Sequence, residues 1–220
     1  MSTQGLGHII LELFVFKFAV KFVIGTFFAI TTASASANPL VDLMKVEDQR
    51  RLCAASEESK DSRTLRREAR YIAEAAGLPD GSYTLLIGEC EGYASAATSI
   101  NTIIVSPELA SVPRNERLFV LAHELAHLAN SDIKRWANLG NTLVETAADS
   151  VKTTELMQSL SRDLELEADM WAAQVLRKLD VNPSRAAAAF WLRMGLLDLP
   201  GTTSHPAAKT RVAAIESFKG

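Results

Sequence analysis

The sequence predicts an α+β fold in which helices surround a small β-sheet whose edge lies beside one central helix. Two segments rich in β-branched residues, 83–88 and 101–106, favour strands, and residues 92–96 are predicted to form a short strand between them. Apolar residues at helical spacing follow from residue 113 onward. About 180 residues remain after the first 37, which suits one domain with its own core.

The first 37 residues have the three parts of a secretory signal peptide. Lys17 and Lys21 precede an uninterrupted apolar stretch at 22–30, and an Ala/Ser run then ends in an Ala-x-Ala cleavage site at Ala37. The alternative is an uncleaved anchor over about residues 9–30. We therefore expect the domain at 38–220 to be exported. It would be periplasmic or secreted after cleavage, or held at the membrane facing the periplasm without it.

A helix is predicted next, over residues 46–76, with a break near 59–62 and a turn-forming segment at 77–81 after it. Four arginines of this helix are interleaved with acidic residues that include Glu68, which indicates a solvated helix face. The formal net charge of the chain is −3 and no basic cluster occurs. Nucleic acid is therefore not an expected partner.

The central helix, predicted at about 113–130, carries the motif His-Glu-x-x-His. Residues four apart lie one turn above each other, so His123 and His127 can offer two imidazole nitrogens to one metal ion. Glu124 lies beside them, within reach of a water molecule on that ion. The polar residues 130–132 are predicted to end the helix. The apolar stripe predicted to face the core consists of Leu118, Leu121, Ala122, Leu125 and Ala129.

A catalytic zinc ion needs a third protein ligand and an open position for water. The helix predicted at 155–179 carries Glu165 and Asp169 on one otherwise apolar face. Buried there, Glu165 could be the ligand and Asp169 the hydrogen-bond acceptor of a ligand imidazole. A solvated acidic helix start is equally compatible with both residues. The other helices are predicted at 133–151, 184–197 and 206–218.

The motif at 123–127 and the later segment Glu165-Leu166-Glu167-Ala168-Asp169 resemble the HtpX-like and CAAX-prenyl-protease-like zinc metallopeptidases, which include a small periplasmic BepA-like branch. The resemblance spans roughly residues 82–211. It implies a zincin-like fold with a gluzincin site that holds one Zn²⁺ per chain. The residues implied are His123, His127 and Glu165 as ligands, Glu124 as general base, and Asp169 as the support of a ligand His.

A late His-Pro segment followed by Arg is a further feature of the family, matched here by His205 and Arg211. The resemblance implies that His205 lies near the zinc and can cap it as a reversible extra ligand. A loop histidine before a helix-starting proline is the alternative. Peptide hydrolysis also needs a second donor for the developing oxyanion, and either His205 or Tyr93 could supply it.

These features predict a zinc endopeptidase whose substrates are unfolded or misassembled envelope polypeptides. The competing hypothesis is a periplasmic chaperone or quality-control binding module with a capped or structural zinc site. An extended peptide could add to the sheet edge as an extra strand. The candidate edge comprises Tyr93, Ala94, Ser95 and Ala96, whose mostly small side chains would leave room for it, although a purely structural strand fits equally well.

Cys53 and Cys90 are the two cysteines of the chain. In an exported protein they could form a disulfide that closes a loop of about 38 residues and stabilises the fold by up to about 4 kcal/mol. Two free buried thiols are the alternative, and neither cysteine belongs to a metal-ligand pattern.

Overall fold

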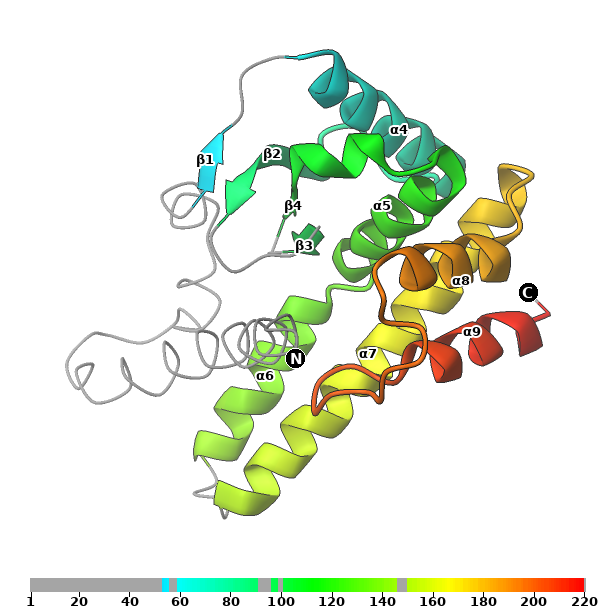
Figure 1. Cartoon of the computed structure of the whole chain (residues 1–220). Helices are drawn as coiled ribbons and strands as arrows, with labels where there is room; N and C mark the ends of the chain where they lie inside the picture. The colour runs from blue at the N-terminus through cyan, green and yellow to red at the C-terminus, as the bar shows by residue number, and fades with distance from the viewer. Residues whose placement is uncertain (1–52, 56–58, 91–95, 99–100, 146–149, 220) are drawn as a thin grey trace, which may run out of the picture.

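The computed structural model describes residues 53–55, 59–90, 96–98, 101–145 and 150–219, and the predicted leader and its cleavage site lie outside this part of the chain. A small sheet sits at one end of the molecule above the helix that carries the motif, and further helices extend below it (Figure 1). The described helices are α4 (Lys60–Ala76), α5 (Arg114–Ala129), α6 (Asp132–Glu145), α7 (Ser150–Lys178), α8 (Pro183–Arg193) and α9 (Ala208–Ser217), with the 3-10 helix η1 (Pro107–Ser111).

The sheet has four strands in the order β1-β2-β4-β3. β2 (Thr84–Cys90) and β4 (Thr102–Val105) run parallel at its centre, while β1 (Cys53–Ala55) and β3 (Ala96–Thr98) pair antiparallel at its two ends. All four residues of β4 are buried, because this strand lies between its neighbours and above α5. The mainly helical α+β architecture predicted from the sequence is confirmed.

The prediction of one helix over 46–76 is wrong at residues 53–55, which form β1, while residues 46–52 lie outside the described residues. These three residues pair with β2, and such long-range pairing leaves no local periodic signal. The predicted break near 59–62 is confirmed, because α4 begins there with a capping box. Ser59 Oγ accepts from the Ser62 backbone N–H, and Ser62 Oγ accepts from the Ser59 N–H.

Other element boundaries also differ from the prediction. The strand expected at 92–96 is observed as β3 from Ala96 to Thr98, and residues 91–95 lie outside the described residues. The helix expected at 133–151 is α6, which ends at Glu145, and α7 already begins at Ser150. η1 separates β4 from α5, where no element was expected. In the part of the chain that the structure describes, no helix has the length and apolarity to cross a membrane.

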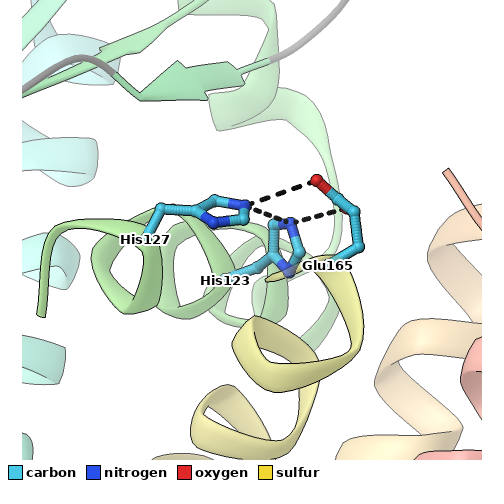
Figure 2. A group of neighbouring side chains, drawn as sticks. All are labelled: His123, His127 and Glu165. Atoms are coloured by element: carbon cyan, nitrogen blue, oxygen red, sulfur yellow. Dashed lines mark hydrogen bonds and ion pairs between the residues drawn. The ribbon is translucent and has the colours of Figure 1, made fainter. Parts of the chain in front are cut away.

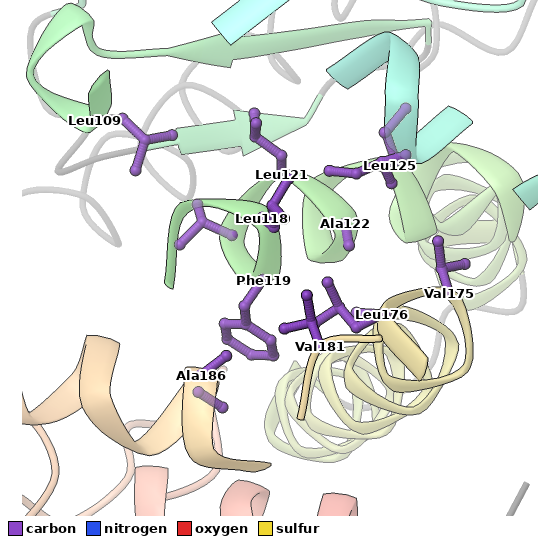
Figure 3. Close-up of a cluster of buried hydrophobic side chains, with 14 of the residues drawn as sticks. Leu109, Leu118, Phe119, Leu121, Ala122, Leu125, Val175, Leu176, Val181 and Ala186 are labelled. Carbon is purple, nitrogen blue, oxygen red and sulfur yellow. The ribbon is translucent and has the colours of Figure 1, made fainter. Parts of the chain in front are cut away.

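The core lies between the sheet, α5, α7 and α8 (Figure 3). Leu118, Leu121, Ala122 and Leu125 are fully buried, as the predicted stripe requires. Ala129 is exposed, so the stripe ends one turn earlier than predicted, where α5 leaves the core. From the opposite side of α5, Phe119 packs edge-to-face on Trp191 of α8 with ring centroids 5.3 Å apart. This packing fixes the rotation of α5 about its axis.

The backbone register of β1 and β2 sets Cys53 directly opposite Cys90. Cross-strand partners of an antiparallel pair have Cα atoms about 4.5–5.5 Å apart, a separation that a disulfide can bridge. The disulfide between these residues therefore stays a prediction that the register favours.

The solvated face predicted for the arginine-rich helix is wrong for Glu68, which is buried on α4. Arg117 of α5 donates to both carboxylate oxygens of Glu68, at 2.8 Å from Nη2 to Oε1. The same guanidinium donates to the backbone carbonyls of Ala110 and Val112 at the end of η1. A buried, bidentate pair thus ties α4 and η1 to the helix that carries the motif.

We expect Arg117→Met to lower the free energy of unfolding by about 3–5 kcal/mol, because it leaves the Glu68 charge buried without its main partner. The matched control is Arg114→Met. Arg114 is half-exposed and lies 3.9 Å from the same carboxylate, so its loss should cost at most about 1 kcal/mol. Urea unfolding followed by circular dichroism measures both. Equal effects of the two substitutions would contradict a special role for the buried pair.

Candidate metal centre

His123 and His127 lie one turn apart on α5, and their rings point toward Glu165 on α7 (Figure 2). The two Nε2 atoms are 3.1 Å apart. Glu165 Oε2 lies 3.3 Å from His123 Nε2, and Glu165 Oε1 lies 3.5 Å from His127 Nε2. The three side chains predicted as ligands therefore converge in space, although Glu165 follows His123 by 42 positions in the sequence. Among the described residues they form the candidate metal-binding group.

The donor atoms of the three side chains lie at separations compatible with a tetrahedral zinc ion. A zinc–nitrogen bond of about 2.0–2.1 Å in a tetrahedral site puts neighbouring ligand atoms about 3.3 Å apart. The two imidazole nitrogens are 3.1 Å apart, and each has a different Glu165 oxygen close to it, at 3.3 Å from His123 and 3.5 Å from His127. Two imidazoles and one carboxylate are also a donor set of catalytic zinc sites, which leave one position open. The residues present therefore fit a zinc ion.

Each ligand imidazole meets a buried carboxylate on its other nitrogen. His123 Nδ1 lies 3.0 Å from Asp169 Oδ1, and His127 Nδ1 lies 2.8 Å from Asp132 Oδ2. Both Asp side chains are almost completely buried. A proton on Nδ1 donated to the carboxylate leaves Nε2 as the free lone pair that faces the metal position. The predicted role of Asp169 agrees with this geometry.

Asp132 was missed at the sequence level, where residues 130–132 were interpreted only as the end of the helix. The chain turns sharply at Ser131, whose φ is +57°, and α6 starts with Asp132. This turn brings the Asp132 side chain back to His127 on the preceding helix. Arg135 donates to Asp132 at 3.1 Å and also bonds to Glu167 of α7, so α6 and α7 are held together beside the site. An acidic residue five positions after the second His was the available signal.

The electrostatics of the site favour a cation between the two imidazoles. Burial alone would lower the pKa of His127, but hydrogen bonds with Asp132 and Glu165 raise it to about 10. Burial also lowers the pKa of His123, whereas the charge of Glu165 and the hydrogen bond with Asp169 raise it. The net effect is a raised pKa. Carboxylates that stabilise protonated imidazoles stabilise a metal ion in the same place, because the metal replaces those protons.

Arg211 of α9 completes the buried network. Its guanidinium donates to both oxygens of Asp169, at 2.6 and 2.7 Å, and its Nη1 lies 2.8 Å from Glu165 Oε2. It stacks over the ring of Trp191, 4.7 Å from the centroid. Burial would raise the pKa of Glu165, but Arg211 and His123 hold it well below its usual range. Glu165 therefore stays ionised, as a metal ligand must.

His205 lies at the rim of the site, with Nε2 3.5 Å from Glu165 Oε1 and about half of its side chain exposed. Ser204 Oγ is 2.8 Å from His205 Nδ1, and the His205 backbone N–H donates to Thr202 Oγ1. Gly201 allows this tight loop, because a Cβ at that position would lie 2.5 Å from the backbone N of Ala207. The structure thus brings His205 to the metal-ligand group, as the family resemblance implied.

Glu124 is buried on the side of α5 that faces β3, where the hydroxyl of Thr98 lies 2.6 Å from its Oε2. The sequence had given no reason to single out Thr98. Of the candidate edge strand, Ala96 lies in β3 at the end of the sheet, and Tyr93, Ala94 and Ser95 lie outside the described residues. Tyr93 therefore remains an untested candidate for the oxyanion donor.

A His-Glu-x-x-His helix beside a sheet edge, joined by a glutamate from a later helix, is the arrangement that the resemblance to zinc metallopeptidases implied. The sequence profile of peptidase family M48 matches residues 59–146 and 134–219 of this chain. The two matches together cover α4 to α9, including every residue of the metal centre, and the chain belongs to this family of metallopeptidases. A comparison with curated proteins found no significant match.

We expect Asp132→Asn to weaken zinc binding by about 10- to 100-fold, because the amide no longer stabilises the correct His127 tautomer as a carboxylate does. Competition with a chromogenic chelator measures the affinity of the purified domain. Arg135→Gln is the matched control. It removes another partner of Asp132 but leaves the contact with His127 intact, so its zinc affinity should stay close to that of the wild type. Equal losses in both variants would contradict an effect through His127.

Proposed function

We propose that this metallopeptidase is a zinc-dependent endopeptidase that hydrolyses peptide bonds of exported polypeptides in unfolded or misassembled states. The observation that carries the proposal is the triangle of His123, His127 and Glu165 ligand atoms with the carboxylate of Glu124 on the same helix. The fit of the donor set to zinc supports the choice of metal. The leader predicted at residues 1–37 supports an exported, periplasmic or secreted location, with membrane attachment only if that segment is not cleaved.

A bound zinc ion would supply an acidified water and a Lewis acid for the scissile carbonyl. The protein side chains would carry out proton transfer and orient the metal ligands. Glu124 takes a proton from the attacking water and delivers it to the leaving amine. Asp132 and Asp169 hold the two imidazoles in the tautomer that faces the metal position. Arg211 keeps Glu165 ionised and fixes its orientation.

The position of β3 supports an extended polypeptide as the substrate. β3 is an end strand of the described sheet and lies beside α5, close to Glu124. Among the described residues no strand pairs with its outer edge, and a strand added there would form backbone hydrogen bonds that do not depend on the substrate sequence. A folded protein rarely offers a free strand, whereas an unfolded one does. Selection of unfolded substrates follows from this mode of binding.

A second candidate function is supported by His205. Its Nε2 lies 3.5 Å from a ligand oxygen, so the loop at 201–207 could close the open metal position. A capped centre would let the protein hold unfolded envelope polypeptides as a quality-control chaperone and cleave them only when the loop moves away. The two functions share one site and differ in whether His205 occupies the open metal position.

Glu124→Gln should reduce hydrolysis of a reduced and alkylated test protein by at least about 100-fold, because glutamine cannot accept the proton. Zinc content should remain one ion per chain. Glu167→Gln is the matched control, since Glu167 is on α7 two residues from a ligand but bonds only to the exposed Arg135 among the described side chains. Peptide fragments are measured by mass spectrometry. Unchanged cleavage by Glu124→Gln would refute the proposed mechanism.

His205→Ala should raise the rate of hydrolysis several-fold, because the open position then stays free for water. Ser204→Ala, which removes a hydrogen bond to His205 Nδ1, should give a smaller rise in the same assay. A loss of activity in His205→Ala would instead assign this residue to oxyanion stabilisation. Binding of the test protein without cleavage by any of these variants would favour the chaperone function.

A further inference from the structure

The carboxylate of Glu124 is held by a side chain from the sheet. Thr98 Oγ1 lies 2.6 Å from Glu124 Oε2 and 3.0 Å from the backbone carbonyl oxygen of the same residue. A carboxylate oxygen and a carbonyl oxygen both accept, so Thr98 donates its one hydroxyl proton, and the shorter contact assigns that proton mainly to Oε2. Within the part of the chain that the structure describes, Thr98 is the hydrogen-bond partner of this carboxylate.

Thr98 is itself well fixed. It is the last residue of β3 and pairs with Ile103 of β4, which is fully buried in the core against α5. A β-branched side chain on a strand also has few rotamers, so the hydroxyl has little freedom to turn away. By contrast, a free glutamate side chain has three rotatable bonds and loses considerable entropy when one orientation is required. β3 therefore orients the Glu124 carboxylate through Thr98, which α5 alone does not do.

We propose that Thr98 is a positioning residue for the general base. Its single proton engages Oε2, and Oε1 is then left as the atom that accepts the proton of the attacking water. The hydrogen bond also confines the carboxylate to the side of α5 that faces β3. The inference rests on the proposed role of Glu124, and it adds a direct connection between the end strand of the sheet and the proton-transfer group.

The contact has a consequence for substrate binding. A polypeptide that adds to the outer edge of β3 would bind to the same strand that holds the base. Movement of β3 by a fraction of an ångström would move the Thr98 hydroxyl and the Glu124 carboxylate together. The base is thereby placed relative to the substrate strand, and catalytic rates respond steeply to such placement.

The test uses Thr98→Val, Thr98→Ser and Thr102→Val in the full chain, with wild type and Glu124→Gln beside them. Valine keeps the β-branched shape but removes the donor, whereas serine keeps the donor. Thr102 is a fully buried residue of β4 whose hydroxyl contacts Asn101, so Thr102→Val makes the same chemical change away from Glu124. Steady-state hydrolysis of a quenched fluorescent peptide gives kcat and KM. Chelator competition gives zinc affinity, and thermal unfolding gives stability.

We expect Thr98→Val to lower kcat by about 10- to 100-fold with little change in KM, zinc affinity or unfolding temperature. Thr98→Ser should recover most of kcat, and Thr102→Val should keep it. A Thr98→Val variant as active as wild type, while Glu124→Gln is inactive, would overturn this inference alone. Parallel losses of zinc affinity and stability would show a structural role and overturn it as well. Equal activity of wild type and Glu124→Gln would remove the proposed function and this inference together.

Discussion

The burial of several carboxylates around two imidazoles between α5 and α7 is the constraint that shapes this protein. Glu124, Asp132 and Asp169 are buried and Glu165 is nearly so, whereas Arg211 is the one buried guanidinium among the described residues that contacts this group. Negative charge is therefore in excess. An excess of this kind is tolerated in a protein interior only when protons or a metal cation balance it. A divalent ion between the imidazoles would reduce that excess, and the donor separations are compatible with zinc.

The surrounding fold permits α5 and α7 to approach closely enough for this. Fully buried alanines occur on both helices, at Ala122 and Ala126 of α5 and at Ala168 and Ala172 of α7. Small side chains at a helix crossing reduce the distance between the axes, so short ligand side chains can meet. The apolar remainder of α5 packs on the sheet and on α8, and this packing holds the polar face toward α7. The buried core around the candidate metal centre thus holds the two helices that carry its ligands.

The remaining elements act on this pair of helices from different sides. The turn at Ser131 returns Asp132 to His127, α9 brings Arg211 to Glu165 and Asp169, and β3 brings Thr98 to Glu124. Each group of the centre is therefore oriented by a neighbour from another segment. The match to peptidase family M48 covers all of these segments. These neighbours hold the candidate ligands in one arrangement, and His205 lies 3.5 Å from Glu165 at its rim.

The amino-acid sequence by itself determined the parts that depend on helical periodicity. The placement of His123 and His127 on one face, and of Glu165 with Asp169, follows from 3.6 residues per turn and needs no knowledge of the fold. Only tertiary packing decided whether the face with the two histidines meets the face with Glu165 and Asp169. The local sequence around Glu165 would look the same if it were a solvated acidic helix start. The strand at 53–55, the burial of Glu68 on Arg117 and the hydrogen bond from Thr98 to Glu124 were likewise invisible locally. Each joins residues through a turn or a distant pairing, and only the folded chain brings such partners together.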